Sequence, residues 1–251
     1  MKDTSIHSSR PGRAFYKVKH LLPGTIAMAG TAGYINSVVL GFFHAPVSHM
    51  TGAVSRLGLD IAERGGRDVW SGVQIIIGFV LGAVLAGILV GARRLSPNRR
   101  FGIALILEGF LLALATLLLR SEHRLGLPAA ALACGLQNAI GSSYCGLQIR
   151  TTHVTGMVTD LGLMIGHWLR LHVVDKRKFL FYTLGFLSFG VGGYIGAVMD
   201  NRFGPISLLL PALSNTVAGV IYSLLVRKYN ARILPPPPLL PPEPVPPVQK
   251  D

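Results

Sequence analysis

Two segments of the sequence combine histidine, threonine and glycine at one spacing and are the clearest candidates for a binding site. They are His49-x-Thr51-Gly52 and His153-x-Thr155-Gly156. We expect a short helix after each segment, with the hydroxyl of Thr51 or Thr155 capping its N-terminus. A helix N-terminus presents free N–H groups and about half a positive charge. Two such ends facing one another would bind an anion or a carboxylate, and His49 and His153 could add donors.

A second interpretation of these segments needs no ligand. In it both are structural turns, in which Gly52 and Gly156 let the chain bend and each histidine bonds to a carbonyl group. The stretches that follow are too short and too polar to cross a bilayer, so they are interfacial helices or the second halves of broken helices. Arg56 and Asp160 occupy equivalent places in them and either pair with each other or face water at opposite interfaces.

Glu108 is the most unusual polar residue, because it lies in the middle of the apolar stretch 101–119. An ionised carboxylate at that depth costs at least about 2.5–3.5 kcal/mol, so the group should be protonated, paired or facing water. This position suits a proton-handling group, and a protonated side chain bonded to a neighbouring helix is the alternative. Asn36 and Asn138 are also interior, where they either line a polar path or join helices through hydrogen bonds.

Apolar elements must position these residues. The chain has 251 residues, of which 50% are hydrophobic and only 14% charged, and its mean hydropathy is +0.50. A soluble domain carries about 25% charged residues, so soluble, disordered and coiled-coil classes are excluded. Six apolar segments reach the length of about 17–25 residues that a membrane-crossing helix needs. They are 25–43, 71–90, 101–119, 127–147, 179–199 and 205–226.

The two halves of the sequence resemble each other. Gly33-x-x-Asn36 is matched by Gly135-x-x-Asn138 at an offset of 102, the two His-x-Thr-Gly segments lie 104 apart, and Gly78-Phe79 is matched with Gly185-Phe186. Each half holds three expected spans, an odd number, so the second half enters the membrane from the opposite side. The predicted fold is an all-α integral membrane protein of six transmembrane helices, built as two inverted three-helix repeats. Each repeat carries a short re-entrant or interfacial helix after its His-x-Thr-Gly turn.

The repeats set the expected organisation of the chain. Residues 1–20 form a basic cytoplasmic arm, 21–120 the first membrane repeat, 127–230 the second, and 231–251 a proline-rich, disordered cytoplasmic tail. Glycine and other small residues lie four apart on two spans, which predicts packing faces inside the protein or at a homodimer contact. These are Gly78, Gly82 and Ala86 in one span and Ser188, Gly192 and Gly196 in another.

Lysine and arginine are divided unequally between the segments that link the spans. Of the 24 basic residues, 18 fall in the N-terminal arm, in 93–100, in 150–178 and in the C-terminal segment. Six spans would place these four regions on one side, and cytoplasmic segments are the ones enriched in lysine and arginine. The sequence therefore predicts a membrane protein with both termini in the cytoplasm. It also explains the net charge of +13 with the lipid bilayer, and no nucleic acid, as partner.

These motifs resemble the YoaK-like family of bacterial multipass membrane proteins, catalogued as domain of unknown function 1275. The resemblance rests on the Gly-x-x-Asn helix, the His-x-Thr-Gly turn and the amphipathic segment after it, and it covers about residues 20–230. It implies an inner-membrane protein of about six spans, without a substrate or catalytic residue to transfer. Many members carry asparagine directly after the first Thr-Gly, where this chain has Ala53 in one half and Met157 in the other.

Two functions fit the sequence. Inverted repeats are typical of secondary transporters, whose ligand site lies near the midplane between the copies. The first function is therefore a carrier or channel-like protein for a small anionic solute, with proton coupling through Glu108 as an added feature. The second is a scaffold or sensor that transports nothing. No hydrolase, phosphate-loop or zinc-protease motif occurs, so we expect no enzyme, no cofactor and no metal site.

Overall fold

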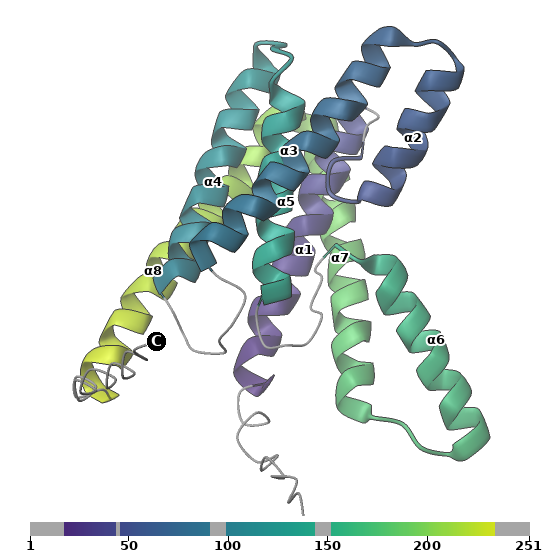
Figure 1. The fold of residues 1–251 in the computed structure, drawn as a ribbon. Coiled ribbons are helices and arrows are strands. Elements are labelled where there is room, and N and C mark those ends of the chain that lie inside the picture. The colour runs from purple at the N-terminus through teal and green to yellow at the C-terminus, as the bar shows by residue number, and fades with distance from the viewer. Residues whose placement is uncertain (1–17, 44–45, 91–98, 144–151, 234–251) are drawn as a thin grey trace, which may run out of the picture.

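A computed structural model describes residues 18–43, 46–90, 99–143 and 152–233, and this part of the chain is helical throughout, without strands (Figure 1). The helices are α1 (Val18–Phe43), α2 (Met50–Ala62), α3 (Gly66–Val90), α4 (Arg99–Arg120), α5 (Gly126–Ser143), α6 (Val154–Leu171), α7 (Lys176–Phe203) and α8 (Leu209–Ile233). A short 3-10 helix, η2 (Gly204–Leu208), joins α7 to α8. Most of the expected basic arm and proline-rich tail, the end of the fourth expected span and Cys145 lie outside the described residues.

The structure confirms an all-helical protein with helices suited to a membrane. Among the described residues, three stretches are long and apolar enough to cross one: Asp68–Val90, Arg99–Arg120 and Lys176–Lys228, with mean hydropathies of 2.7, 2.4 and 1.7. The last contains α7, η2 and α8, and α1 contributes a shorter apolar stretch, Ile26–Phe42. Many large apolar side chains are exposed, and Ile88 is 73% exposed. Such exposure is expected where lipid replaces water as the solvent.

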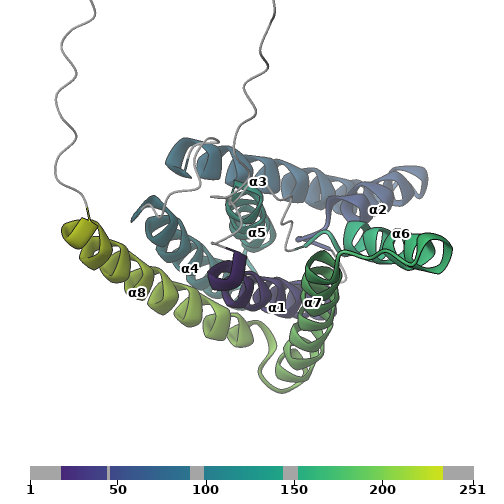
Figure 2. The ribbon, with the colours of Figure 1, turned by 90° about the horizontal axis from the view of Figure 1, so that it is seen from below.

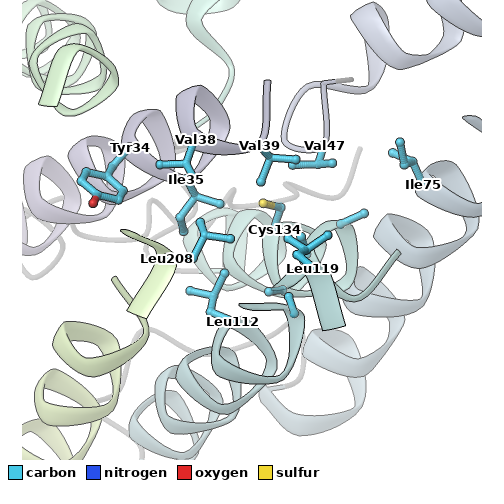
Figure 3. Packing of buried hydrophobic residues seen from close by; sticks show 14 of the residues in the cluster. Tyr34, Ile35, Val38, Val39, Val47, Ile75, Leu112, Leu119, Cys134 and Leu208 are labelled. Carbon is cyan, nitrogen blue, oxygen red and sulfur yellow. The ribbon is translucent and has the colours of Figure 1, made fainter. Parts of the chain in front are cut away.

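The helices pack in pairs that are distant in sequence. The broadest contacts join α1 to α7, α3 to α5 and α4 to α8, and α4 also packs against α5. Figure 2 shows α7 and α8 diverging from a shared corner with α1 between them. At that corner Gly204 has a φ of +57°, a left-handed conformation that glycine adopts without strain. Buried aliphatic side chains from α1, α4 and α5, with Leu208 of η2, fill the centre of the bundle (Figure 3).

Small residues let the paired backbones touch, and the two largest pairs do so in the same way. A Cβ atom at Gly33 would collide with the Phe189 carbonyl group of α7, and one at Gly135 with the Phe79 carbonyl group of α3. Likewise Gly192 of α7 lies against the Gly30 carbonyl group of α1, and Gly82 of α3 lies against the Leu132 carbonyl group of α5. Phe79 therefore corresponds to Phe189, 110 positions later, and the sequence match of Gly78-Phe79 with Gly185-Phe186 was wrong by three residues.

The contact between α4 and α8 obeys the same offset of 110. A Cβ atom at Gly109 would collide with the Ala212 carbonyl group, and one at Gly219 with the Gly102 carbonyl group. Because Gly102 and Gly109 lie 110 positions before Ala212 and Gly219, each contact reproduces the other with the helices exchanged.

Both glycine-rich faces are used inside the chain. Gly78 and Gly82 meet the backbone of α5, while Gly192 and Gly196 meet the backbone of α1. Of the two expectations for these faces, the structure shows packing inside the protein.

We predict that Gly82→Ala destabilises the protein although alanine is the better helix former. The new Cβ must displace the α5 backbone, and overpacking of this kind costs about 1–3 kcal/mol. Gly87→Ala is the matched control, because Gly87 lies on the same helix with nothing within 4 Å of a Cβ and gains about 1 kcal/mol of helix propensity. Unfolding in detergent by added sodium dodecyl sulfate measures both, and equal stabilities for the two variants would contradict the close α3–α5 contact.

Candidate functional site

The two His-x-Thr-Gly segments each start a short helix, two residues earlier than expected. The N-cap residues are His49 of α2 and His153 of α6, and neither side chain makes a capping hydrogen bond. Thr51 and Thr155 are the second helical residues and are exposed, so the expected threonine caps were wrong. The first N–H groups of both helices are left without an acceptor from the helix itself.

Each histidine ring folds back over the first turn of its own helix. A Cβ atom at Gly52 would collide with the His49 imidazole, and a Cβ atom at Gly156 would collide with the His153 imidazole. The glycine of the motif therefore leaves room for the histidine of the motif, three residues earlier. The His49 side chain is partly buried and that of His153 is exposed.

A hydroxyl group immediately before each histidine ties the turn to an asparagine. Ser48 Oγ donates to Asn36 Oδ1 at 2.7 Å, and Thr152 Oγ1 donates to Asn138 Oδ1 at 3.0 Å. Asn36 belongs to α1 and Asn138 to α5, so each turn is fixed to the first helix of its own half. Ser48 and Thr152 were missed in the sequence, although the shared hydroxyl type at matched positions was a usable signal.

The two tethered turns send their helices in opposite directions. Figure 1 shows α2 and α6 beginning near the mid-height of the bundle and running to opposite ends. Contacts fix α2 on α3 and α6 on α7, and within the described ranges α2 and α6 do not pack on each other. Both turns thus lie on the same flank of the molecule, as the second view agrees (Figure 2).

The charged residues at matched positions of α2 and α6 do not meet. Arg56 Nε instead pairs with Asp60 Oδ1 of the same helix at 2.8 Å, and the Asp60 side chain is only 5% exposed. Asp160 interacts with the Tyr182 hydroxyl group on α7. Of the two alternatives for Arg56 and Asp160, the pair between them is wrong, because each residue has a nearer partner in its own half of the chain.

Glu108 is fully buried between α4 and α8. Its Oε1 accepts a hydrogen bond from Asn215 Nδ2 at 2.7 Å, while Oε2 has no partner among the described residues. By the 110-residue offset, Glu108 and Asn215 correspond to Ala218 and Leu105, so the polar pair has an apolar equivalent. The offset of 102 that relates Asn36 to Asn138 would point to Leu210 instead.

The structure thus assembles two separate groups of the expected residues. One group is the pair of turns with Asn36 and Asn138, and the other is Glu108 with Asn215. No set of three or more histidine, cysteine, aspartate or glutamate side chains suited to a metal occurs in the described ranges.

The match to a family covers both groups. The family described as "Protein of unknown function (DUF1275)" matches residues 24–221. The chain belongs to this family, in agreement with the resemblance seen in its motifs. No curated protein and no solved structure matches the chain.

We predict that the Asn36–Ser48 hydrogen bond stabilises the first turn. Ser48→Ala leaves the buried Asn36 amide oxygen unpaired, which costs about 1–3 kcal/mol. A double-mutant cycle with Asn36→Ala should give a coupling energy of about 0.5–3 kcal/mol, measured by unfolding in detergent. Ser55→Ala, at an exposed position of α2, is the control and should change little. Additive effects of Asn36→Ala and Ser48→Ala would show that the bond contributes nothing.

Proposed function

We propose that the protein is a secondary carrier of a small anionic solute, with two tethered turns as its solute site and Glu108 as its proton-binding group. One observation carries the proposal: two matched turns, each held by a hydroxyl-to-asparagine bond, start helices near mid-height that run to opposite ends. Paired broken helices of this kind form the sites of many inverted-repeat transporters.

The proposed architecture is six membrane spans in two inverted repeats. The spans are α1, α3, α4, α5, α7 and α8, and the repeats run from α1 to α4 and from α5 to α8. Support comes from the matching contacts of α1 with α7 and of α5 with α3, and from the exchange symmetry of α4 with α8. The first helix of each repeat packs on the third helix of the other repeat, which is its second span.

The proposed orientation places both termini in the cytoplasm of a bacterial cell, with the protein in the inner membrane. In Figure 1 the start of α1, the α6–α7 link and the end of α8 lie at one end of the bundle. The α2–α3, α4–α5 and α7–α8 corners lie at the other. Among the described residues, the first end carries more lysine and arginine than the second, and an excess of these residues marks the cytoplasmic side.

An anion is the solute that the turns suit. The first turns of α2 and α6 present N–H groups without intrahelical acceptors and the positive ends of two helix dipoles. These groups are surrounded by the two motifs, His49, Thr51 and Gly52 in one turn and His153, Thr155 and Gly156 in the other. Asn36 and Asn138 position the turns and do not need to touch the solute.

Proton coupling is assigned to Glu108. An ionised carboxylate without a cation beside it is costly in a buried apolar setting, so the resting side chain is neutral and Oε2 holds the proton. Asn215 keeps Oε1 in place when the proton leaves. The equivalent residues, Ala218 and Leu105, are apolar, so the α4–α8 contact holds one proton-binding pair and not two.

The competing function is a membrane scaffold or sensor that transports nothing. It is favoured by the contacts of the turns, since Asn36 bonds to Ser48 and His49 fits against Gly52 without any ligand. The two functions differ in whether a solute binds at the turns and whether water reaches Glu108.

We predict that an anionic solute stabilises the purified protein and that Thr51→Ala/Thr155→Ala removes the effect. The assay is a thermal-shift screen of organic acids, amino acids and inorganic anions. A ligand at 100 times its dissociation constant adds about 2.7 kcal/mol to the free energy of unfolding. Ser55→Ala/Thr159→Ala is the matched control, one turn farther along each helix, and should keep the shift. A thermal shift that persists in Thr51→Ala/Thr155→Ala would contradict binding of the solute at the turns.

We predict that a cysteine beside Glu108 reacts with a water-soluble thiol reagent. Ala104→Cys lies one turn before Glu108 on α4, at a fully buried position, so its reaction requires that water reaches the interior of the bundle there. It would be introduced after replacing Cys134 and Cys145 with alanine.

Two exposed positions calibrate this measurement. Glu122→Cys at the α4–α5 corner and Arg227→Cys on α8 serve as references for the outer and cytoplasmic sides. An Ala104→Cys protein that stays unmodified from both sides, while the references react, would exclude a carrier and favour the scaffold.

A further inference from the structure

A groove on the outside of the bundle belongs to neither group of residues. It lies between α1, α7 and α8, in the angle that Figure 2 shows between the diverging α7 and α8, and has a volume of about 330 Å³. Its rim includes Val191, Leu210 and Ile195, which are 58%, 54% and 42% exposed. The groove therefore opens onto an apolar surface and not into a water-lined channel.

The described walls of the groove offer no charge and no free hydroxyl donor. Their hydroxyl groups all donate to backbone carbonyl groups of the protein itself: Thr31 to Ala27, Tyr34 to Ser207, Ser188 to Ile26 and Ser214 to Pro211. None of the described side chains that line it is charged. An anion would gain nothing there, so the groove is unsuited to the solute proposed for the turns.

The helix arrangement does not itself require a groove at this place. The equivalent position in the other half, between α5, α3 and α4, is filled with protein side chains. Offsets of 102 and 110 relate Tyr34 to Leu136 and Pro211 to Phe101. Both Leu136 and Phe101 are buried in a packed cluster with Ala86, Ala104 and Ile140. In keeping with this, α4 packs broadly on α5 whereas α8 scarcely touches α1.

We propose that the groove binds one acyl chain of a bilayer lipid, which takes the place that Phe101 fills in the other half. The side chains that line the groove expose apolar surface and no charge, so they suit an occupant of apolar chemistry. A bilayer surrounds the rim with such chains, and a narrow groove between helices suits a flexible hydrocarbon. The lipid would join α8 to α1, a contact that the protein makes weakly by itself.

The first test measures lipid retained by the full chain after delipidation in detergent, by native mass spectrometry. We expect one phospholipid on the wild-type protein and none on Ala27→Phe, in which a ring fills the groove as Phe101 fills its counterpart. Leu213→Phe is the matched control, because Leu213 is 65% exposed on α8 and does not line the groove. Equal retention by the three proteins would overturn the proposal.

The second test does not use Ala27→Phe for its main result, so it remains valid if that variant folds poorly. After replacing Trp70 and Trp168 with phenylalanine, a tryptophan is placed at Ile195 or, as control, at Leu213. A phospholipid with a brominated acyl chain should quench Ile195→Trp at lower lipid fractions than Leu213→Trp. Equal quenching would overturn the proposal. Modification of Ser214→Cys by a water-soluble thiol reagent would also overturn it, because water would then fill the groove. So would a dimer of the wild-type protein that Ala27→Phe abolishes, because a second copy would then fill the groove.

Discussion

The close backbone contact between helices of opposite halves is the constraint on which the rest of the structure depends. Because Gly33 and Gly192 remove side chains from the α1–α7 contact, and Gly135 and Gly82 from the α3–α5 contact, the helices approach to backbone distance. Close approach of this kind drives helix association where lipid removes the hydrophobic force between helices. Each half thus holds the first helix of the other, and neither forms a separate bundle.

The tethered turns follow from that constraint. With α1 fixed on α7 and α5 fixed on α3, Asn36 and Asn138 stand at defined places, and a hydroxyl group before each histidine attaches the chain there. The glycine three residues after each histidine then admits the imidazole ring. A binding function and a structural function would use the same geometry up to this point, and they differ only in what meets the free N–H groups of the first turn.

The sequence predicted the helical class, the family and the likeness of the two halves, because apolar length and repeated motifs are local signals. It failed where the result depended on which element comes nearest. Arg56 and Asp160 occupy matched positions, yet Asp60 lies one turn from Arg56 and forms the ion pair with it. The offset of 102 read from the first motif would match Glu108 with Leu210. The second half holds eight more residues between its first and third helices, five of them in the longer α6, and only the packing of α4 on α8 reveals Ala218 as the counterpart. The sequence could not predict the groove, because the groove depends on how α1, α7 and α8 are spaced and no sequence motif marks it.

The pairing of α1 with α7 sets the order in which the protein can be assembled. Ser188 bonds to the Ile26 carbonyl group across 162 positions of sequence, so α1 is synthesised long before its partner helix. At about 5–20 residues per second, synthesis delays the contact by roughly 8–30 s. Throughout that interval the glycine face of α1 is uncovered, and a chain that stops before α7 leaves it so. The packing of α1 is therefore completed only when the C-terminal half of the chain has been made.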